Sequence, residues 1–272
     1  MKMKKIALKK ILSKFNLLPV IEQVNFRRQK WKNRKSNHEF REKNPTVKLP
    51  PDFYLYETFN LNYDKFYTNG KPTSAWLVDH ISEFKDFKNL SILDWGCGTG
   101  RILRHLPTIL DTSNSFYGTD YNKKYVKWCS ENLEGIQIKN NFLKPPLDFK
   151  DDSMDVIYGI SIFTHLSEEL HFSWIHELTR VLKNEGVLFL TTHGEAHKFK
   201  LLPKEQLLYD AGNLIVHAYK KEGNRLYASY QSPKFFKDLC SKNNLEVLKH
   251  IPGEIRNSQP QQDVWVLRLT KN

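Results

Sequence analysis

The chain contains few cysteines. Among its 272 residues there are only Cys97, Cys129 and Cys240, and no two of them form a Cys-x-x-Cys pair. An odd number of widely spaced cysteines argues against a disulfide framework and against a structural zinc site, and it favours a reducing compartment. The spacing of the other metal-ligating residue types points to no metal site either.

Long apolar runs are also missing. No run approaches the roughly 18–20 residues that a membrane span needs. Lys9, Lys10 and Lys14 interrupt the apolar residues near the N-terminus, so we expect no secretory signal. Together with the few cysteines, this predicts a cytoplasmic protein.

Residues 51–272 lack a surplus of positive charge. The chain has 42 Lys and Arg against 30 Asp and Glu, a formal net charge of +12. Residues 1–50 contain 15 basic and 3 acidic residues, whereas residues 51–272 contain 27 of each. A neutral body has no excess charge with which to bind phosphates, which argues against a uniformly basic nucleic-acid-binding domain. The charge belongs to an extension.

Residues 2–18 of this extension fit an amphipathic helix, with lysines opposite an apolar face made of Ala7, Leu8, Ile11, Leu12, Phe15 and Leu18. Pro19 is expected to interrupt it, and residues 26–43 are basic with no clean period. Binding to an anionic membrane surface at the inner face of the cell is one role for residues 2–18. Packing on the body as a cap is the other.

From residue 91 onwards, strand-like and helix-like segments alternate. We expect strands at 91–95, 115–119, 136–139, 154–160 and 187–192, and helices at 100–110, 122–133 and 167–183. An amphipathic helix over 74–88, with Ser74 as N-cap, precedes them, and a hairpin (214–219 with 225–231), a helix (233–243) and two strands (245–250, 263–269) follow. This alternation predicts an α/β fold with a doubly wound, largely parallel sheet.

The sequence LDWGCGTGR (93–101) ends the first strand and carries a Gly-x-Gly-x-Gly pattern. Glycines at this place allow a tight turn and let the backbone approach a ligand. No Gly-Lys-Ser/Thr follows, which excludes a P-loop, and the spacing does not suit NAD. Asp120 ends the second strand, where an acid can accept hydrogen bonds from both hydroxyls of a ribose. These motifs predict a nucleoside-containing ligand across the carboxyl ends of strands 1 and 2.

The glycine turn and the YGTD segment ending at Asp120 resemble those of the class I (Rossmann-like) S-adenosylmethionine-dependent methyltransferases. The resemblance covers residues 91–192 well and the order of elements to residue 270 loosely. It implies a seven-stranded methyltransferase domain over 51–272 with a cofactor-binding core at 91–192, preceded by the basic, partly helical extension over 1–50 that the charge distribution indicates. NGKPTSAWL (69–77), SIFTHL (161–166), TTHG (191–194) and QDVWVLR (262–268) are similar to a bacterial subgroup linked with glycan or small-metabolite modification.

The resemblance implies that S-adenosylmethionine is the cofactor and that its contacts include Asp94, Gly96, Cys97, Gly98, Gly100, Asp120, Tyr121, Asn141, Phe142 and Ser161. Asp120 matches the family's ribose-binding acid. Asn141 falls where the family usually has an acid contacting adenine, and an amide can still hydrogen-bond that base. Cys97 is expected to be a small residue packed beneath the ligand.

Methyl transfer to an alcohol needs a proton acceptor. His165 follows strand 4 and His193 follows strand 5, so both are candidate catalytic bases at the edge where open α/β sheets bind ligands. For His165, a hydrogen bond to the backbone is an equal alternative. His171, His176 and His197 are expected on helix or loop surfaces, without a role.

Residues 195–231 exceed the length that a strand-to-helix link requires, and we interpret them as an insertion on the substrate side. Substrate contacts are expected from Tyr230 and Gln231 in this insertion and from Tyr67 in the N-terminal aromatic block, and packing is the alternative role of such aromatic residues. Tyr219, Tyr227, Tyr63 and Phe66 are further candidates of the same kind.

The preferred hypothesis is O-methylation of a sugar, a glycan-linked intermediate or a small metabolite. One alternative is an RNA methyltransferase whose basic extension holds RNA, and another is a methyltransferase-like binding module without catalysis. Gly159-Ile160-Ser161-Ile162 stands where amino-methylating nucleic-acid enzymes of this superfamily have Asn-Pro-Pro-aromatic. This difference counts against DNA base N-methylation.

Overall fold

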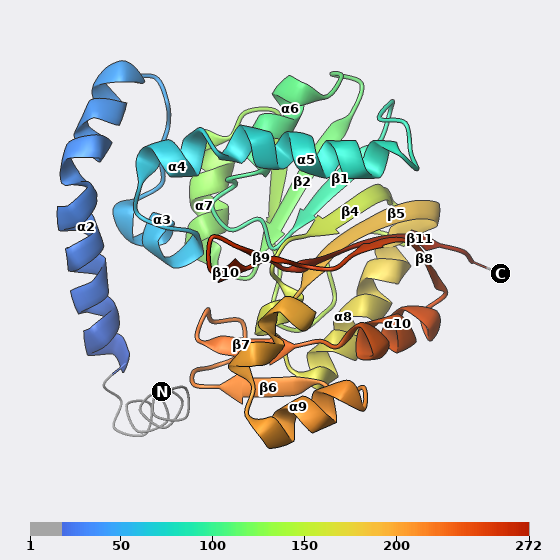
Figure 1. Cartoon of the computed structure of the whole chain (residues 1–272). Helices are drawn as coiled ribbons and strands as arrows, with labels where there is room; N and C mark the ends of the chain where they lie inside the picture. Colours follow the sequence, from blue (N-terminus) through green and yellow to red (C-terminus); the bar gives the residue numbers. More distant parts are fainter. Residues whose placement is uncertain (1–17, 272) are drawn as a thin grey trace.

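Seven strands form the central sheet of the structure, a computed structural model that describes residues 18–271 (Figure 1). Their order is β3-β2-β1-β4-β5-β11-β8. The bounds are β1 (Ser91–Trp95), β2 (Ser115–Asp120), β3 (Ile136–Asn140), β4 (Met154–Gly159), β5 (Leu182–Thr192), β8 (Leu245–Ile251) and β11 (Asp263–Leu269). The first five strands are parallel, and β11 runs antiparallel to β5 and β8. The predicted seven-stranded Rossmann-like α/β sheet is confirmed.

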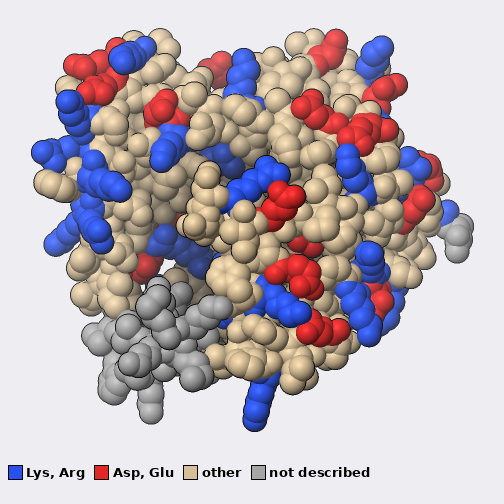
Figure 2. All heavy atoms as spheres, viewed as in Figure 1, with Lys and Arg blue, Asp and Glu red and all other residues tan. Residues whose placement is uncertain are grey.

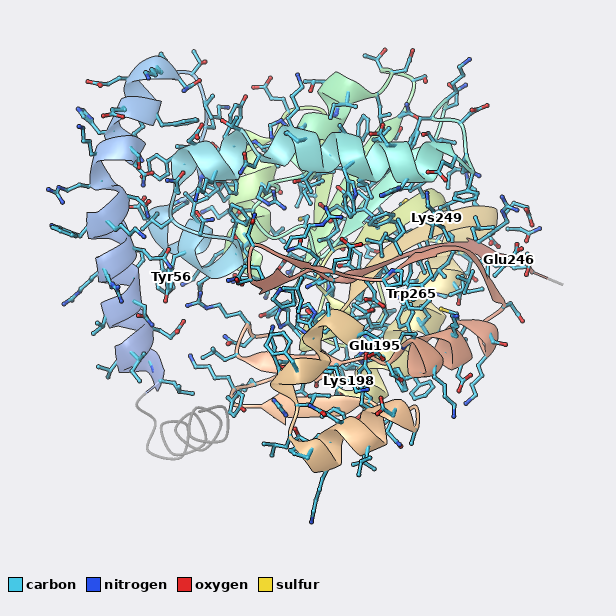
Figure 3. All side chains as sticks on the ribbon, viewed as in Figure 1. Tyr56, Glu195, Lys198, Glu246, Lys249 and Trp265 are labelled. Atoms are coloured by element: carbon cyan, nitrogen blue, oxygen red, sulfur yellow. The ribbon has the colours of Figure 1, made fainter. Side chains whose placement is uncertain are left out.

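Helices cover both faces of this sheet, because the strands carry apolar side chains on both faces and each face has to be buried. One face packs against α5 (Gly70–Ser82), η1 (Leu103–His105) and α6 (Leu106–Ile109). The other packs against α8 (Glu168–Val181) and α10 (Pro233–Ser241), with Trp265 of β11 at its centre (Figure 3). α7 (Lys123–Asn132) lies beside β2 and β3.

Local capping explains where two of these helices begin. The side chain of Asn122 accepts a hydrogen bond from the Lys124 amide, and that of Ser167 accepts one from the Leu170 amide, so α7 and α8 start as predicted. The predicted N-cap at Ser74 is wrong. Ser74 lies inside α5, and its hydroxyl donates to the carbonyl oxygens of Gly70 and Ile102.

Two helix boundaries also differ from the prediction. Residues 100–110 form the short 3-10 turn η1 and the four-residue α6 instead of one helix, because Pro107 sits at the start of α6 and three positive-φ glycines precede it. Helix α8 ends at Val181, and β5 begins at once and contains Gly186. Gly186 therefore lies within the strand, which begins earlier than the predicted residue 187.

Helix α2 (Leu18–Lys43) is a single helix of 26 residues that stands along one side of the molecule (Figure 1). Pro19 lies in the first turn of α2, where a missing N–H leaves no helical hydrogen bond unmade; the break predicted there, at the end of the helix over 2–18, lies at the limit of the described residues. Residues 26–43, whose apolar residues show no clean helical period in the sequence, are helical throughout. Apart from Leu18, the helix expected over 2–18 lies outside the described residues.

One side of α2 packs against α3 (Asp52–Thr58) and α4 (Tyr63–Tyr67). We call this side the seam; it consists of Phe26, Gln29, Asn33, Asn37 and Phe40. Asn37 is buried, and its Oδ1 accepts a hydrogen bond from the Tyr63 amide at 2.9 Å. Phe40 joins an apolar cluster with Leu55 and Phe66. Mixed polar and apolar contacts therefore hold α2 to the body.

The insertion contains η3 (Glu195–Lys200), α9 (Pro203–Asp210) and the antiparallel pair β6 (Ile215–Ala218) and β7 (Tyr227–Tyr230), which Figure 1 shows together at the bottom of the view. The predicted hairpin is confirmed. Glu195 and Lys198 lie on η3 (Figure 3), and an ion pair of Lys198 with Asp210 ties η3 to α9. β9 (Ile255–Arg256) and β10 (Gln259–Pro260) lie between β8 and β11 in the sequence and pair with each other as a separate two-stranded sheet. Within residues 18–271, no helix has the length and apolar character needed to cross a membrane.

Candidate functional site

The turn after β1 is held against the end of β2 by backbone hydrogen bonds. The amides of Gly96 and Cys97 both donate to the Thr119 carbonyl oxygen, at 2.9 and 2.8 Å. Gly96 has a φ of +80°, and a Cβ placed there would lie 2.2 Å from the Ile162 side chain. This position therefore requires glycine for its conformation and for space.

Asp120 joins the two strand ends at the side-chain level. Its Oδ2 accepts a hydrogen bond from the Gly98 amide at 3.0 Å, and its Oδ1 accepts one from the Asn122 amide at 2.7 Å. Burial raises the pKa of Asp120 to about 6, although both hydrogen bonds act in the opposite direction. Each carboxylate oxygen keeps a further lone pair for a ligand hydroxyl.

A small cavity of about 70 Å³ lies beside Asp120. Tyr121 and Phe142, which are 45% and 72% exposed, contribute aromatic rings to it. Its wall also contains Asn141, whose Oδ1 is buried and has no hydrogen-bond partner, while its Nδ2 donates to the Phe142 carbonyl oxygen. A buried acceptor without a donor destabilises the protein unless a ligand supplies one. The exocyclic amine of adenine is such a donor, so this wall fits an adenosine.

The insertion closes this small cavity from the other side. The Tyr121 hydroxyl donates to the Gly223 carbonyl oxygen at 3.1 Å, and the Gly223 amide donates to the carbonyl oxygen of His165 at 2.9 Å. The loop between β6 and β7 is thus tied both to the end of β2 and to the segment after β4. Adenosine bound here would contact this loop on one side.

A larger cavity of about 690 Å³ adjoins the small one, and Gly96 lines both. One wall is the glycine turn with Asp94, Cys97 and Gly98. The opposite side combines aromatic, basic and amide groups, among them Phe59, Trp76, His80, Arg101, His197, Arg256, Gln261 and Gln262. The cavity can therefore take a polar molecule next to the glycine turn.

Ser161 lies at the tip of β4 and lines the large cavity. It has a φ of +68°, a conformation that few non-glycine residues adopt. Its amide donates to the Thr191 hydroxyl at 2.8 Å, and its hydroxyl accepts from the Gln262 amide nitrogen at 2.6 Å. Thr191 in turn donates to Gln262 Oε1 at 2.6 Å. This closed network holds the backbone of Ser161 in place beside the turn.

Asp94 is 5% exposed at the wall of the large cavity. Burial raises the pKa of Asp94 to about 7, and the nearby charge of Asp120 raises it further, while Tyr158 and Arg101 lower it. Two carboxylates in one buried site repel each other. A cationic ligand group between the turn and Asp94 would relieve this repulsion, and the ammonium group of S-adenosylmethionine fits that requirement.

Nine of the ten predicted cofactor residues line these cavities. Asp94, Gly96, Cys97, Gly98 and Ser161 line the large cavity, and Asp120, Tyr121, Asn141 and Phe142 line the small one with Gly96. Gly100 lines neither. It has a φ of +69°, and a Cβ there would lie 2.4 Å from Leu133, so its glycine is explained by packing against the end of α7.

The histidines are distributed differently from the prediction. His165 lines the small cavity, and its Nδ1 lies 2.7 Å from the Tyr227 carbonyl oxygen. His193 lines neither of these cavities; its Nδ1 lies 3.0 Å from the Ser229 carbonyl oxygen, and its ring stacks on Tyr230. The surface positions expected for two other histidines are wrong: His171 is 0% exposed and bonds Gln231, and His197 is 3% exposed and lines the large cavity.

The three expected substrate residues do not line the large cavity. Tyr67 packs against His105, with ring centroids 5.2 Å apart, and borders a separate groove. Tyr230 is buried against His193. Gln231 is 1% exposed, and it accepts from the His193 amide and donates to the Phe163 carbonyl oxygen. The packing alternative accounts for all three, and Gln231 links β7 to the ends of β4 and β5.

Several cavity residues were not singled out from the sequence. Thr58 and Arg101 line the large cavity beside the turn, and Thr191 and Gln262 hold Ser161. Thr191 and Gln262 belong to the TTHG and QDVWVLR segments on which the resemblance partly rested, and that was their only signal. Thr58 comes from α3, about 40 residues before the turn, and no local pattern marks it.

Residues 93–190 match the profile of a family described as a methyltransferase domain. The chain is 25% identical over 173 residues to a ubiquinone biosynthesis O-methyltransferase of Pelagibacter ubique, covering 62% of this chain and 66% of that protein. It is 24% identical over 212 residues to a tRNA N(3)-methylcytidine methyltransferase of Schizosaccharomyces pombe, covering 71% and 64%. The chain thus spans just under two thirds of the length of both relatives.

Solved structures share the fold. A SAM-dependent methyltransferase of Methanosarcina mazei has a TM-score of 0.54 at 18% identity, covering 71% of this chain and 98% of that chain. Magnesium protoporphyrin IX methyltransferase of Synechocystis, solved with bound SAH, has a TM-score of 0.55 at 14% identity, covering 89% and 98%. The architecture of this chain therefore recurs in proteins that bind this type of cofactor.

The raised pKa of Asp94 predicts a pH-dependent gain in stability when the carboxylate is removed. Folding raises the pKa of this group from about 4 to about 7, so the folded protein holds the extra proton, and its stability falls as pH rises through that window. We expect Asp94→Asn to raise the free energy of unfolding by about 3 kcal/mol near pH 8 and to change it little near pH 4. Urea unfolding at both pH values measures this. The exposed Asp79→Asn is the control, and an equal effect of Asp94→Asn at both pH values would contradict the account.

Proposed function

Because the chain belongs to the class I S-adenosylmethionine-dependent methyltransferases, we propose that it transfers a methyl group to a hydroxyl oxygen of a small molecule. The matching domain profile, the shared fold and the cofactor-binding neighbour agree with the sequence-based prediction of an S-adenosylmethionine-dependent methyltransferase. The observation that carries the proposal is the pairing of two adjoining cavities. One carries the Asp120 carboxylate and the unpaired Asn141 acceptor, and the other lies open beside the same glycine turn.

The lining of the large cavity supports a polar acceptor molecule of modest size. The aromatic residues Phe59 and Trp76 line it together with the amide side chains of Gln261 and Gln262. This combination suits a sugar or another hydroxylated ring, which presents apolar faces and polar edges. The resemblance to enzymes named as ubiquinone biosynthesis O-methyltransferases supports oxygen as the methyl acceptor. We therefore retain a sugar, a glycan-linked intermediate or a small metabolite as the substrate class.

The cofactor supplies a methyl group already activated on a sulfonium, so the protein mainly has to hold the reactants in line. Asp120 would accept hydrogen bonds from the ribose hydroxyls, and Asn141 Oδ1 would accept one from the adenine amine. Asp94 would hold the ammonium group. The glycine turn and the rigid Ser161 backbone shape the boundary between the two cavities, and the loop at Gly223 forms one wall of the small one.

His197 is the residue we assign to remove the proton from the acceptor hydroxyl. It lines the large cavity, and its Nδ1 is buried without a hydrogen-bond partner. Burial lowers the pKa of His197 to about 4, and the charge of Lys200 acts in the same direction. The ring is therefore neutral at physiological pH, and the tautomer with hydrogen on Nε2 leaves Nδ1 free to accept a proton. His165 is then a wall of the adenosine pocket.

RNA methylation is the second candidate function. The relative named as a tRNA methyltransferase supports it, and so does the excess of basic residues on α2. The equal numbers of acidic and basic residues in 51–272 argue against a continuous RNA track across the catalytic body.

Removal of the Asp120 carboxylate should weaken cofactor binding. We expect wild-type protein to bind S-adenosylmethionine in a calorimetric titration, and Asp120→Ala to bind about a hundredfold more weakly, because two hydrogen bonds to a charged acceptor are lost. Asn141→Ala should bind about tenfold more weakly, while Asn141→Asp keeps the acceptor and should retain affinity. The exposed Asp86→Ala is the control. Equal affinity of Asp120→Ala and wild type would refute the assignment of this pocket.

Replacement of His197, the assigned proton acceptor, should slow methyl transfer. A panel of sugars, nucleotide sugars and substituted phenols, incubated with methyl-labelled cofactor, identifies an acceptor, and a transfer-RNA sample tests the second candidate. On that acceptor, His197→Asn should lower kcat by about 100-fold or more with little change in cofactor affinity. His176→Asn, which replaces an exposed histidine on α8 that lines neither cavity, is the matched control. If the two variants lose activity equally, His197 is a packing residue, and labelling of RNA alone would favour the second candidate.

A further inference from the structure

The outer face of α2 presents apolar side chains to solvent although the helix is already packed on its other side. Val20, Val24 and Trp31 are 61%, 59% and 68% exposed. On a helix that turns about 100° per residue, these three positions fall within about 40° of one another, opposite the seam. We call them the outer stripe. Exposed apolar residues aligned in this way usually mark an interaction surface.

Basic residues flank the outer stripe on both sides. Arg27 lies on one flank. Arg28 and Lys32 lie on the other, where they are exposed and border the cavity between α2 and Arg225. Among the described residues, the ion pairs of α2 lysines involve Lys30 and Lys35 and none of these three residues. The Arg34 guanidinium lies 4.8 Å from the centroid of the Trp31 ring. Figure 2 shows the resulting row of blue side chains along the edge of the molecule formed by α2, with little red among them. In all, α2 carries eight Lys and Arg against three Glu.

We propose that the outer face of α2 docks the protein on an anionic membrane surface. A helix that combines an apolar stripe containing Trp with flanking Arg and Lys lies in the plane of the lipid headgroups, with the stripe turned towards the acyl chains. The unpaired basic side chains would face anionic headgroups. Residues 1–17, which precede α2 in the sequence, add six lysines and no acidic residue. The positive charge that complements an anionic surface is therefore not confined to α2. This proposal does not depend on which acceptor is methylated.

The packed seam gives this surface a fixed place on the molecule. Asn37 and Phe40 attach α2 to the body through buried contacts, and an ion pair between Glu22 and Arg225 joins its first half to the insertion. The helix therefore does not need to leave the body in order to bind a membrane. Docking through α2 would hold the whole enzyme at the surface with the seam turned away from the lipid.

Two other occupants of the outer face are less favourable. RNA would be held by the arginines and could stack on Trp31, but two exposed valines contribute nothing to either contact. A second copy of the chain docked through the same face would bring Arg27 and Arg28 of both copies together, and like charges at an interface oppose association. A lipid surface uses the apolar and the basic residues at once.

The test measures binding of the full-length protein to vesicles by co-sedimentation. We expect binding to vesicles of equal parts phosphatidylcholine and phosphatidylglycerol, and weak binding to phosphatidylcholine alone. A charge variant (Arg27→Gln, Arg28→Gln, Lys32→Gln) should lower the partition coefficient about a hundredfold, because each basic residue near an anionic surface contributes about 1 kcal/mol. A stripe variant (Val20→Gln, Val24→Gln, Trp31→Gln) should lower it at least about tenfold.

Matched controls separate this surface from general charge and hydrophobicity. The variant Lys234→Gln, Lys237→Gln, Lys242→Gln removes three exposed lysines from α10 and its end, and Leu207→Gln, Leu208→Gln removes two exposed leucines from α9. Both controls should bind like wild type, and circular dichroism should show that all variants are folded.

Three outcomes overturn the proposal. The first is that wild type does not bind the anionic vesicles. The second is that the stripe variant binds as well as wild type, which leaves only non-specific charge attraction. The third is that the outer face serves another occupant. RNA binding by wild type, lost in the charge variant without any vesicle binding, identifies RNA; a concentration-dependent dimer lost in the stripe variant identifies a second copy.

Discussion

The hydrogen bond from the Gly98 amide to the Asp120 carboxylate is the interaction on which the candidate site depends. It links the turn after β1 to the tip of β2, and Gly98 makes it from a φ of +55°, a conformation that glycine adopts without steric strain. The amides of Gly96 and Cys97 fix the same turn through the Thr119 carbonyl oxygen. The positions of both cavities follow from this arrangement, because one lies on each side of the turn.

The same arrangement leaves the free protein with poorly compensated buried groups. Asp94 and Asp120 are both buried and near enough to repel each other, and Asn141 has an acceptor without a donor. Each of these features destabilises the empty site. A ligand with an ammonium group, a pair of hydroxyls and an aromatic amine would compensate all three at once. The site is thus explained better as a binding site than as part of the packed core.

The parts of the site predicted from the sequence are those that local rules determine. The glycines and Asp120 lie in short segments whose conformation depends on neighbouring residues, and Asn122 and Ser167 cap their helices through contacts three residues away or fewer. The misplaced residues depend on contacts distant in sequence. His197 reaches the cavity because η3 folds back and Lys198 pairs with Asp210, and Gln262 meets Ser161 across 101 positions. The length of α2 was missed because its packed seam mixes amides with phenylalanines and shows no simple apolar period.

The central claim is that Asp94 and Asp120 become fully ionised when a cationic nucleoside cofactor binds beside them. The most direct test is calorimetric titration of the protein with S-adenosylmethionine near pH 6.5, in phosphate and in a buffer with a much larger ionisation enthalpy. Because burial raises the pKa of Asp94 to about 7 and that of Asp120 to about 6 in the free protein, binding should release close to one proton there. The observed enthalpies in the two buffers should then differ by close to the difference between the two buffer ionisation enthalpies. Binding with the same enthalpy in both buffers at pH 6.5 would contradict this account.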